Sequence, residues 1–509
     1  MDAMRAEHVP IARHPVIYEI NTWPWLSGLG STFGREVTLG SVPEEIWDEV
    51  TASSIGSGPI DAVWLMGVWQ RSPAGVRIGL ADDPLVDTFR AALPDFTADD
   101  VVGSPYSIRD YVVDPHLGGP EGLAAARRAL AARGVGLILD FVPNHVATDH
   151  PWATASPQRF VTGTDADLTA HPTEFVQVGG TVIANGRDPY FAPWRDVLQL
   201  NAFDPGLRSA ARDTVRSIAE QCDGVRCDMA MLMCNRIFGE TWSGRVGPAP
   251  EVDYWDAVIP AIRADHPDFL FIAEAYWGTE GLLRSQGFDH CYDKGFTDAL
   301  EHHPHSIGTL IAEALDRDGA VHFIENHDES RAQKVFGDRH RTAAITALTQ
   351  PGARLVYEGQ FDGRTVRLPV QLRREPEQPV VEGLPDFYRR LLAVLGDEAL
   401  HAGGFSALEI HGWPDNPAGP GLAAWSWSGP GRRWLFVVNL DDADGAGLVH
   451  TAWNDLAGRP ATLSDPIADV TYERPDDPDP TIFVMLPPWG AHVLEISTGV
   501  WPQPATTTW

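Results

Sequence analysis

Short apolar runs alternate with amphipathic helical patterns over most of the chain. In residues 207–222, for example, Leu207, Ala211, Val215 and Ile218 fall on one helical face, and residues 121–133, 254–263 and 385–395 have similar patterns. Eight apolar runs have the length of strands: residues 16–21, 62–67, 136–141, 224–227, 269–273, 288–292, 321–326 and 354–358. Apolar strands that are each followed by a helix predict a parallel sheet with a covered outer face. Eight such units predict closure into a (β/α)8 TIM barrel.

Two segments break this rhythm. Residues 146–205 are rich in Thr, Asp, Gly, Pro and aromatic residues and lack a helical period, which predicts a small inserted domain after the third strand. Towards the end of the chain, short apolar runs separated by Gly, Pro and Asp predict an antiparallel β-sandwich; they cover residues 422–427, 434–440, 448–453, 482–486 and 491–496.

These patterns predict four parts. The barrel takes residues 1–145 and 206–398, and the inserted domain takes residues 146–205. The C-terminal β-sandwich takes residues 399–498, and residues 499–509 form a disordered tail.

The charge of the chain limits its partners. The formal net charge is −32, and only Lys294 and Lys334 are lysines. Such a chain repels nucleic-acid phosphates and anionic lipid surfaces, so we expect no nucleic-acid or membrane partner. A neutral substrate is the natural fit.

The N-terminal residues, the apolar runs and the cysteines bear on the cellular compartment of the protein. The first residues carry Arg, Glu and His without an apolar stretch, so we expect no signal peptide. No apolar run approaches the ~20 residues of a membrane span. Cys222, Cys227, Cys234 and Cys291 lack metal-site spacing and read as buried packing in a reducing compartment. A cytoplasmic location is the expectation.

Three apolar runs lead into a carboxylate: Asp228, Glu274 and Asp328. Asp140 stands at the polar end of a fourth run. Burying an ion costs several kcal/mol unless it is paired, so these endings are unusual for purely structural strands. They predict acidic side chains converging at the carboxyl end of a barrel, where such barrels keep their chemistry. Most enzymes that cleave a glycosidic bond use two carboxyl groups that flank it.

The sequence around these carboxylates resembles a known family. The four motifs are Asp-Phe-Val-Pro-Asn-His at 140–145, Gly-Val-Arg-Cys-Asp at 224–228, Glu-Ala-Tyr-Trp at 274–277 and Phe-Ile-Glu-Asn-His-Asp at 323–328. They resemble the four signatures of the α-amylase family, glycoside hydrolase family 13, in the family's order. Residues 106–111, 197–201 and 351–360 resemble its flanking segments.

The resemblance implies catalytic roles. Asp228 would be the nucleophile that forms a covalent glycosyl intermediate, and Glu274 the general acid and base. Asp328 would bind sugar hydroxyls and stabilise the oxocarbenium-like transition state. Arg226, two residues before Asp228 on the same strand, projects to the same side and can hold Asp228 ionised, although a simple structural ion pair is the alternative.

The resemblance also implies sugar-binding residues and no cofactor. His145 and His327 would hydrogen-bond the sugar at the cleavage site, and Tyr106 would stack under it. Trp277 belongs to the third motif and is a further candidate for substrate binding. In many exo-acting α-glucosidases an Asp follows the stacking tyrosine, but here the residue is Ser107, and Arg364 or Asp362 could substitute. Asp140 is expected to orient its neighbours.

One departure concerns metal. Met229-Ala230-Met231-Leu232-Met233 follows the proposed nucleophile where typical amylases carry a Lys-His pair. The missing histidine contributes to the structural calcium site of calcium-bound amylases. Asn144 alone offers one oxygen, whereas calcium takes six to eight. We therefore expect no calcium site and no other metal.

Several readings stay open. The first is a retaining α-glycoside hydrolase for small α-glucosides or malto-oligosaccharides, favoured by the aromatic residues of the insert: Trp152, Phe160, Tyr190, Phe191 and Trp194. The second is a transglycosylase or sugar isomerase that uses the same intermediate. The third is a non-catalytic carbohydrate-binding barrel, which would be expected to lose a carboxylate. No motif fixes linkage, acceptor or oligomeric state.

Overall fold

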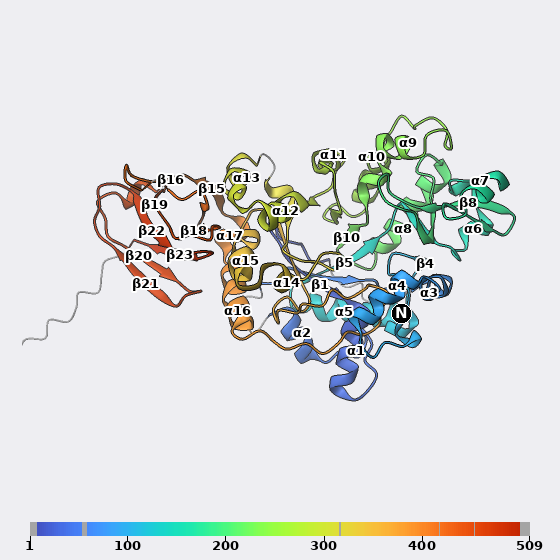
Figure 1. Cartoon of the computed structure of the whole chain (residues 1–509), viewed down its shortest axis with the longest axis horizontal. Helices are drawn as coiled ribbons and strands as arrows, with labels where there is room; N and C mark the ends of the chain where they lie inside the picture. Colours follow the sequence, from blue (N-terminus) through green and yellow to red (C-terminus); the bar gives the residue numbers. More distant parts are fainter. Residues whose placement is uncertain (1–7, 53–58, 315–316, 417, 452, 499–509) are drawn as a thin grey trace, which may run out of the picture.

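A computed structural model describes residues 8–52, 59–314, 317–416, 418–451 and 453–498. At its centre eight parallel strands close into a barrel, in the order β1-β2-β5-β10-β11-β12-β13-β14 and back to β1 (Figure 1). Their bounds are β1 (Val16–Asn21), β2 (Ala62–Met66), β5 (Gly136–Phe141), β10 (Gly224–Cys227), β11 (Leu270–Ala273), β12 (His290–Tyr292), β13 (Ala320–His322) and β14 (Ala353–Tyr357). The predicted (β/α)8 barrel is confirmed.

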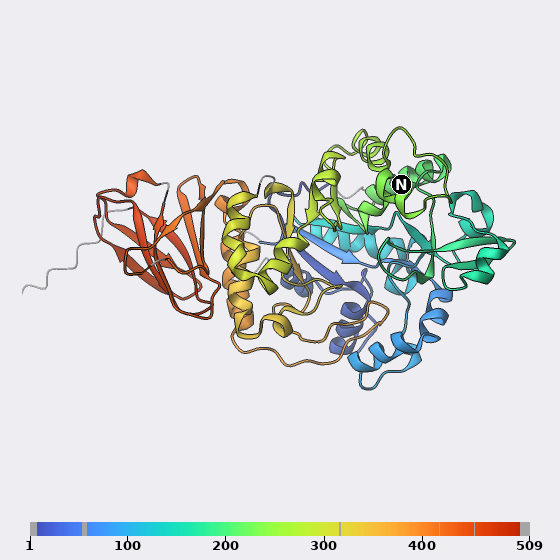
Figure 2. The ribbon, with the colours of Figure 1, turned by 45° about the horizontal axis from the view of Figure 1, so that its top comes forward.

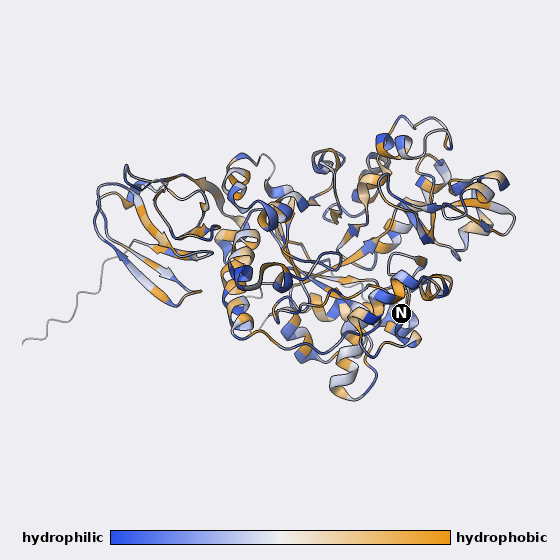
Figure 3. Ribbon diagram, viewed as in Figure 1, coloured by the Kyte–Doolittle hydropathy of each residue, from blue (hydrophilic) through white to orange (hydrophobic). Residues whose placement is uncertain are grey.

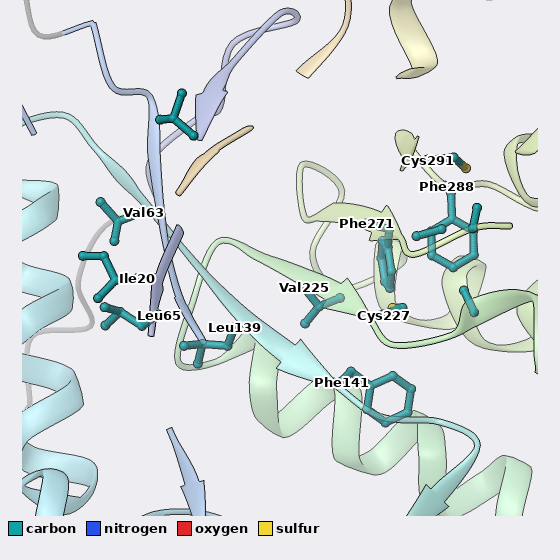
Figure 4. Close-up of a cluster of buried hydrophobic side chains, with 14 of the residues drawn as sticks. Ile20, Val63, Leu65, Leu139, Phe141, Val225, Cys227, Phe271, Phe288 and Cys291 are labelled. Carbon is teal, nitrogen blue, oxygen red and sulfur yellow. The ribbon is translucent and has the colours of Figure 1, made fainter. Parts of the chain in front are cut away.

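Alternate residues of the strands face opposite sides of the barrel wall. The interior cluster includes Ile17, Trp64, Ile138 and Leu355. The outer cluster packs against the helices, and Figure 4 shows part of it, from Ile20 and Val63 to Phe271 and Phe288. Because both faces are buried, the strands read as continuous apolar runs. The four cysteines are buried, and Cys227 and Cys291 belong to the outer cluster.

The main helices of the barrel are α5 (Gly119–Ala131), α8 (Pro205–Ala219), α10 (Tyr254–Arg263), α15 (His340–Leu348) and α16 (Leu384–Leu395). Helix α8 shows why such a segment is helical. The Asp204 side chain accepts a hydrogen bond from the Leu207 N–H, proline stands in the first turn, and Leu207, Val215 and Ile218 are buried on one stripe.

Further helices complete the shell and fill the connections. They are α1 (Thr22–Phe33), α2 (Glu44–Val50), α3 (Pro73–Leu80), α4 (Asp83–Ala92), α9 (Asn235–Thr241), α11 (Glu280–Ser285), α12 (Lys294–His302), α13 (Ile307–Glu313), α14 (Ala332–Phe336) and α17 (Glu398–Ala402). Most have only two turns or so, too few for hydrophobic periodicity to reveal them.

The excursion after β5 folds into a small antiparallel sheet. Its order is β6 (His145–Ala147), β9 (Trp194–Gln199), β8 (Thr181–Gly186) and β7 (Phe175–Val178), with helices α6 (Trp152–Ala155) and α7 (Asp165–Ala170) beside it. A two-stranded ribbon, β3 (Trp69–Arg71) with β4 (Ile108–Val113), follows β2. Strand β6 starts four residues after β5, so the small sheet is attached at the carboxyl end of the barrel.

The C-terminal part forms two antiparallel sheets. One has the order β15-β17-β18-β23-β20-β21 and the other β16-β19-β22. The strands are β15 (Gly404–Leu408), β16 (Ile410–His411), β17 (Leu422–Gly429), β18 (Arg432–Asn439), β19 (Gly445–His450), β20 (Ala461–Asp465), β21 (Val470–Arg474), β22 (Thr481–Leu486) and β23 (Ala491–Ser497). The sequence pattern missed β15, β16, β20 and β21; most residues of the edge strand β21 are exposed, which erases the apolar signal.

The three parts line up along the long axis of the molecule. The C-terminal sheets lie at one end and the inserted sheet at the other, with the barrel between them, in both views (Figures 1 and 2). Hydrophobic residues concentrate on the strands, whereas the helices carry both kinds (Figure 3). Among the described residues, no helix has the length and apolar character to cross a membrane. The predicted disordered tail, residues 499–509, lies outside the described residues.

Candidate active site

Arg226 is the centre of a polar cluster at the carboxyl end of the barrel. Its side chain rises from β10 into the barrel and is 1% exposed. Atom Nη1 lies 2.8 Å from Oδ1 of Asp228, and Nη2 lies 2.8 Å from Oε2 of Glu274. Aromatic rings close the remaining sides: Trp64, Tyr106 and Tyr292. A buried cation needs such partners, and this one joins the first two predicted carboxylates.

Asp228 continues the line of β10. Its backbone N–H donates to the Phe141 carbonyl at the end of β5, so the chain stays extended where the carboxylate emerges. The residue is 5% exposed. Burial raises the pKa of the Asp228 carboxyl above its usual range, and the charge and hydrogen bond of Arg226 limit that rise. The direct hydrogen bond from the guanidinium favours the ionised form.

Glu274 emerges from β11 and is 3% exposed. Burial raises the pKa of its carboxyl to about 7, with the Arg226 charge opposing the rise and the Asp228 charge adding to it. Oε1 accepts from the Tyr276 hydroxyl at 2.9 Å, and Oε2 accepts from the Met229 N–H at 2.6 Å. Met229 has a φ of 41°, in the left-handed region, and this unusual backbone aims its N–H at Glu274.

Asp328 lies at the mouth of the barrel beside a charged histidine. Nε2 of His327 lies 2.9 Å from Oδ2 of Asp328 and 2.7 Å from the Tyr106 hydroxyl. Burial raises the pKa of Asp328, but the His327 charge and hydrogen bond lower it more, so the pKa is below its usual range. Asp328 is therefore an anion at neutral pH, in contact with His327.

His145 and Tyr106 approach the same cluster from two connections. Nε2 of His145 lies 4.0 Å from Oδ2 of Asp228, and burial lowers the pKa of His145 to about 3, so the ring is neutral. The ring of Tyr106 stacks on that of His327 with centroids 5.4 Å apart. Six of the sequence-predicted residues thus gather around Arg226: Tyr106, His145, Asp228, Glu274, His327 and Asp328.

Trp277 stands further out, on the side of Glu274. It is 42% exposed and has a φ of 62°, again left-handed. The ring of Tyr190 from the inserted segment meets it edge to face, with centroids 4.8 Å apart. Tyr190 and Phe191 are 69% and 72% exposed. These three rings leave an exposed aromatic wall between the insert and the barrel.

Arg364 forms ion pairs with nearby acidic side chains. Its guanidinium contacts Glu375, lies 3.2 Å from Glu358 and lies 3.7 Å from Asp362. A sugar hydroxyl would have to compete with these ion pairs. Ser107, in the position after Tyr106, donates its Oγ hydrogen to the Asp196 carbonyl at 2.9 Å and so ties this segment to the inserted sheet.

Several residues at this end of the barrel escaped the sequence reasoning. Tyr276 and Met229 hydrogen-bond Glu274, and the charge of Arg367 lowers the pKa of Asp328. Glu19 on β1 contacts Nδ1 of His327 and is fully buried. Glu19 carried a usable signal, because an acidic residue within an apolar strand is the same anomaly that pointed to the other carboxylates. Asp140, expected from the sequence to orient its neighbours, accepts from the Gly67 N–H and the Trp64 ring N–H.

The residues around Asn144 do not fit calcium. Nε2 of Gln199 donates at the point where three oxygens converge: Asn144 Oδ1 at 2.8 Å, the Asn144 carbonyl at 3.0 Å and the Leu200 carbonyl at 3.1 Å. Calcium takes six to eight oxygens, carboxylates prominent among them. The Gln199 amide is a hydrogen-bond donor within this set. In the described part of the chain, no group of three or more His, Cys, Asp or Glu side chains is arranged to hold a metal ion.

Comparison with known proteins identifies relatives. No family model matches the chain. It is 23% identical over 299 residues to Alpha-amylase 3 of Dictyoglomus thermophilum, which covers 53% of this chain and 56% of that protein. It is 22% identical over 315 residues to an intracellular maltogenic amylase of Bacillus subtilis, which covers 58% of this chain and 50% of that protein. The chain spans about half the length of these curated relatives.

Solved structures extend the likeness to nearly the whole chain. An α-amylase from Geobacillus thermoleovorans, complexed with acarbose, matches with a TM-score of 0.65 at 17% identity, covering 96% of this chain and 100% of that one. At this identity the match shows the shared fold. It includes the barrel, whose carboxyl end carries the cluster around Arg226.

The environment of Gln199 generates a prediction about metal. Because the Gln199 amide already donates into the set of three oxygens at Asn144 and Leu200, excess chelator should leave the melting temperature of the wild-type protein unchanged, as measured by differential scanning calorimetry. Gln199→Ala should lower the melting temperature, since each buried group left unpaired costs about 1–3 kcal/mol. Added calcium should not restore it. A large fall with chelator, reversed by calcium, would show a metal site that this interpretation misses.

Proposed function

The chain belongs to the α-amylase family, and on that premise we propose that it is a retaining α-glycoside hydrolase acting on small α-glucosides or malto-oligosaccharides. The observation that carries this proposal is the buried guanidinium of Arg226 in contact with both Asp228 and Glu274. One cation that holds two carboxylates in unlike environments is suited to a reaction that needs one of them ionised and the other protonated.

In the proposed first step, Asp228 attacks the anomeric carbon and the bond to the leaving oxygen breaks. Glu274 donates its proton to that oxygen, and a glycosyl ester forms on Asp228. In the second step Glu274, now a carboxylate, takes a proton from water, and the water oxygen attacks the anomeric carbon. Asp228 leaves as a carboxylate. Two inversions give net retention of configuration.

The surroundings of the two carboxyls support this assignment. Asp228 receives a direct hydrogen bond from Arg226, which favours its anion. The pKa of Glu274 is raised to about 7, chiefly by burial, so a large fraction carries a proton at neutral pH. Once that proton has left, the Tyr276 hydroxyl and the Met229 N–H can both donate to the carboxylate. The same groups can thus stabilise Glu274 as the base in the second step.

The neighbouring residues are proposed to bind the sugar. Asp328 and His327 would hold hydroxyl groups of the ring undergoing cleavage, and Tyr106 would stack against that ring. His145, neutral and 4.0 Å from Asp228, can hydrogen-bond a further hydroxyl. A neutral oligosaccharide suits this cluster, because the protein has a net charge of −32.

A second function has a specific observation in its favour. A transglycosylase or sugar isomerase would use the same intermediate and pass it to a sugar in place of water. The exposed wall of Trp277, Tyr190 and Phe191 stands on the Glu274 side, where an acceptor sugar would enter. A non-catalytic carbohydrate-binding barrel is disfavoured, because the three carboxylates each retain a cationic partner. A cytoplasmic location is also proposed, because the Bacillus subtilis relative is an intracellular maltogenic amylase.

The pKa of Glu274 generates a prediction about pH. A general acid must be protonated, so kcat/KM for maltose or maltotriose should fall as pH rises through about 7. The nucleophile must be ionised, so the same quantity should also fall at acid pH, as Asp228 becomes protonated. The profile measured by glucose release should be bell-shaped, and an alkaline limb lying well above neutrality would contradict the assignment.

The control uses a leaving group that needs little protonation. On α-glucosyl fluoride the wild-type alkaline limb near neutrality should disappear. Glu274→Gln should lose about 10²–10⁴-fold in kcat/KM on maltose and much less on the fluoride. Equal losses on both substrates would remove Glu274 from the role of acid.

The aromatic wall generates a prediction about substrate size. Three rings beside the barrel mouth favour a few bound sugar units, so maltose and maltotriose should have a higher kcat/KM than soluble starch. Trp277→Ala should raise KM for maltotriose, since it removes the large amphipathic ring on which a sugar could stack. Trp413→Ala is the matched control, because Trp413 is also partly exposed, at 37%, but lies beside the C-terminal sheets. Rapid random cleavage of internal starch bonds, seen as a fast loss of iodine staining, would contradict this prediction.

A further inference from the structure

Glu19 is an acidic residue inside the barrel with one polar partner. It lies on β1 between Trp64 of β2 and Tyr357 of β14 and is fully buried. Oε1 contacts Nδ1 of His327, while Oε2 has no hydrogen-bond partner among the described residues. A carboxylate buried in this way costs several kcal/mol unless a cation compensates it. In the described structure the hydrogen-bonded candidate for that cation is His327.

His327 has acceptors on both ring nitrogens. Nδ1 faces Glu19, and Nε2 faces Oδ2 of Asp328 and the Tyr106 hydroxyl. A neutral imidazole has one N–H and one acceptor nitrogen, whereas an imidazolium donates from both. Two carboxylates on opposite edges of the ring therefore match the imidazolium. The ring is also clamped between Tyr106, stacked on it, and Trp64, which meets it edge-on.

We infer that Glu19 is a positioning residue for the reaction. By accepting from Nδ1–H of His327, it fixes the ring as a two-sided donor, so that Nε2–H is always presented to Asp328 and the sugar. This inference rests on the proposed function, because it concerns the sugar-binding side of the same site. It adds a residue of the first barrel strand, β1, to the groups that position the sugar-binding side chains.

The charges around the pair agree with this role. Burial lowers the pKa of His327, but Asp328 and Glu19 together raise it to about 10. Other titratable groups on the surrounding strands and connections also interact with Glu19 or His327. They are Tyr106, Asp140, Tyr292, Glu325 and Tyr357. Tyr106, Tyr292 and Tyr357 have pKa values well above their usual range, chiefly through burial, and stay neutral. Glu325 is occupied by Arg331 and the Ala332 N–H.

The first test observes the ring itself. In [15N]histidine-labelled wild-type protein, proton–nitrogen correlation spectra should show an imidazolium at a pH about two units above the ordinary histidine pKa. Its signals are identified by their loss in His327→Asn. In Glu19→Gln, which keeps the shape and removes the charge, the ring should be neutral at that pH. A neutral ring in the wild type, or an imidazolium that persists in Glu19→Gln, would overturn the inference.

The second test measures the consequence for turnover. On α-glucosyl fluoride, where the Glu274 limb is absent, Glu19→Gln should lower kcat/KM by about 10- to 100-fold, the usual effect of losing a charged hydrogen bond. It should also introduce an alkaline limb that the wild type lacks. A flat profile with wild-type kcat/KM would contradict the inference.

Glu325→Gln is the matched control. It makes the same change in an equally buried glutamate, which pairs with Arg331. This variant should unfold more easily than the wild type, but its kcat/KM profile on α-glucosyl fluoride should show no new alkaline limb. The spectra also separate the two proposals. If no glycoside is turned over by the wild type, the proposed function fails, while an imidazolium that depends on Glu19 would still be observed.

Discussion

The carboxyl end of the barrel depends on one constraint: more carboxyl groups are buried there than cations. Glu19, Asp140, Asp228 and Glu274 are buried beside Arg226 and the His327 ring, and the partly exposed Asp328 adds a fifth carboxyl group at the barrel mouth. Arg226 and the His327 ring cannot stabilise all four buried groups as anions, so protons must remain on some of the carboxyls. Burial raises the pKa of Asp140 to about 6 and that of Glu274 to about 7. The shortage of cations thus supplies the proton that the proposed general acid needs.

The inserted sheet supports this charged cluster through one strand, β9. From β9, the Trp194 ring packs against His145 with centroids 5.1 Å apart, the Asp196 carbonyl accepts from Ser107, and Gln199 holds Asn144. Each contacted residue lies within one position of a proposed sugar-binding residue or is one itself. The insert therefore sets the position of Tyr106 and His145 through these contacts, and Tyr190 brings an aromatic ring to Trp277.

The sequence predicted the barrel and most of this cluster because both depend on local patterns. Strands buried on both faces are apolar throughout, and a carboxylate at such a strand's end is conspicuous, as at Asp228 and Glu274. The contact of Glu19 with His327 joins residues 308 positions apart and exists only once the barrel has closed. The hydrogen bond of Gln199 to Asn144 could not be predicted either, because it also forms only in the folded chain. Strand β21 escaped because an exposed edge strand needs no apolar residues.

The central claim is that Asp228 forms a covalent bond to the sugar, and direct trapping tests it. The protein would be incubated with 5-fluoro-α-glucosyl fluoride, whose intermediate forms faster than it is hydrolysed, and then digested and analysed by mass spectrometry. The account predicts one added fluoroglucosyl group on the peptide that contains Asp228, and none in Asp228→Asn. A glycosylated peptide from another part of the chain, or fluoride release with an inverted sugar and no adduct, would contradict it.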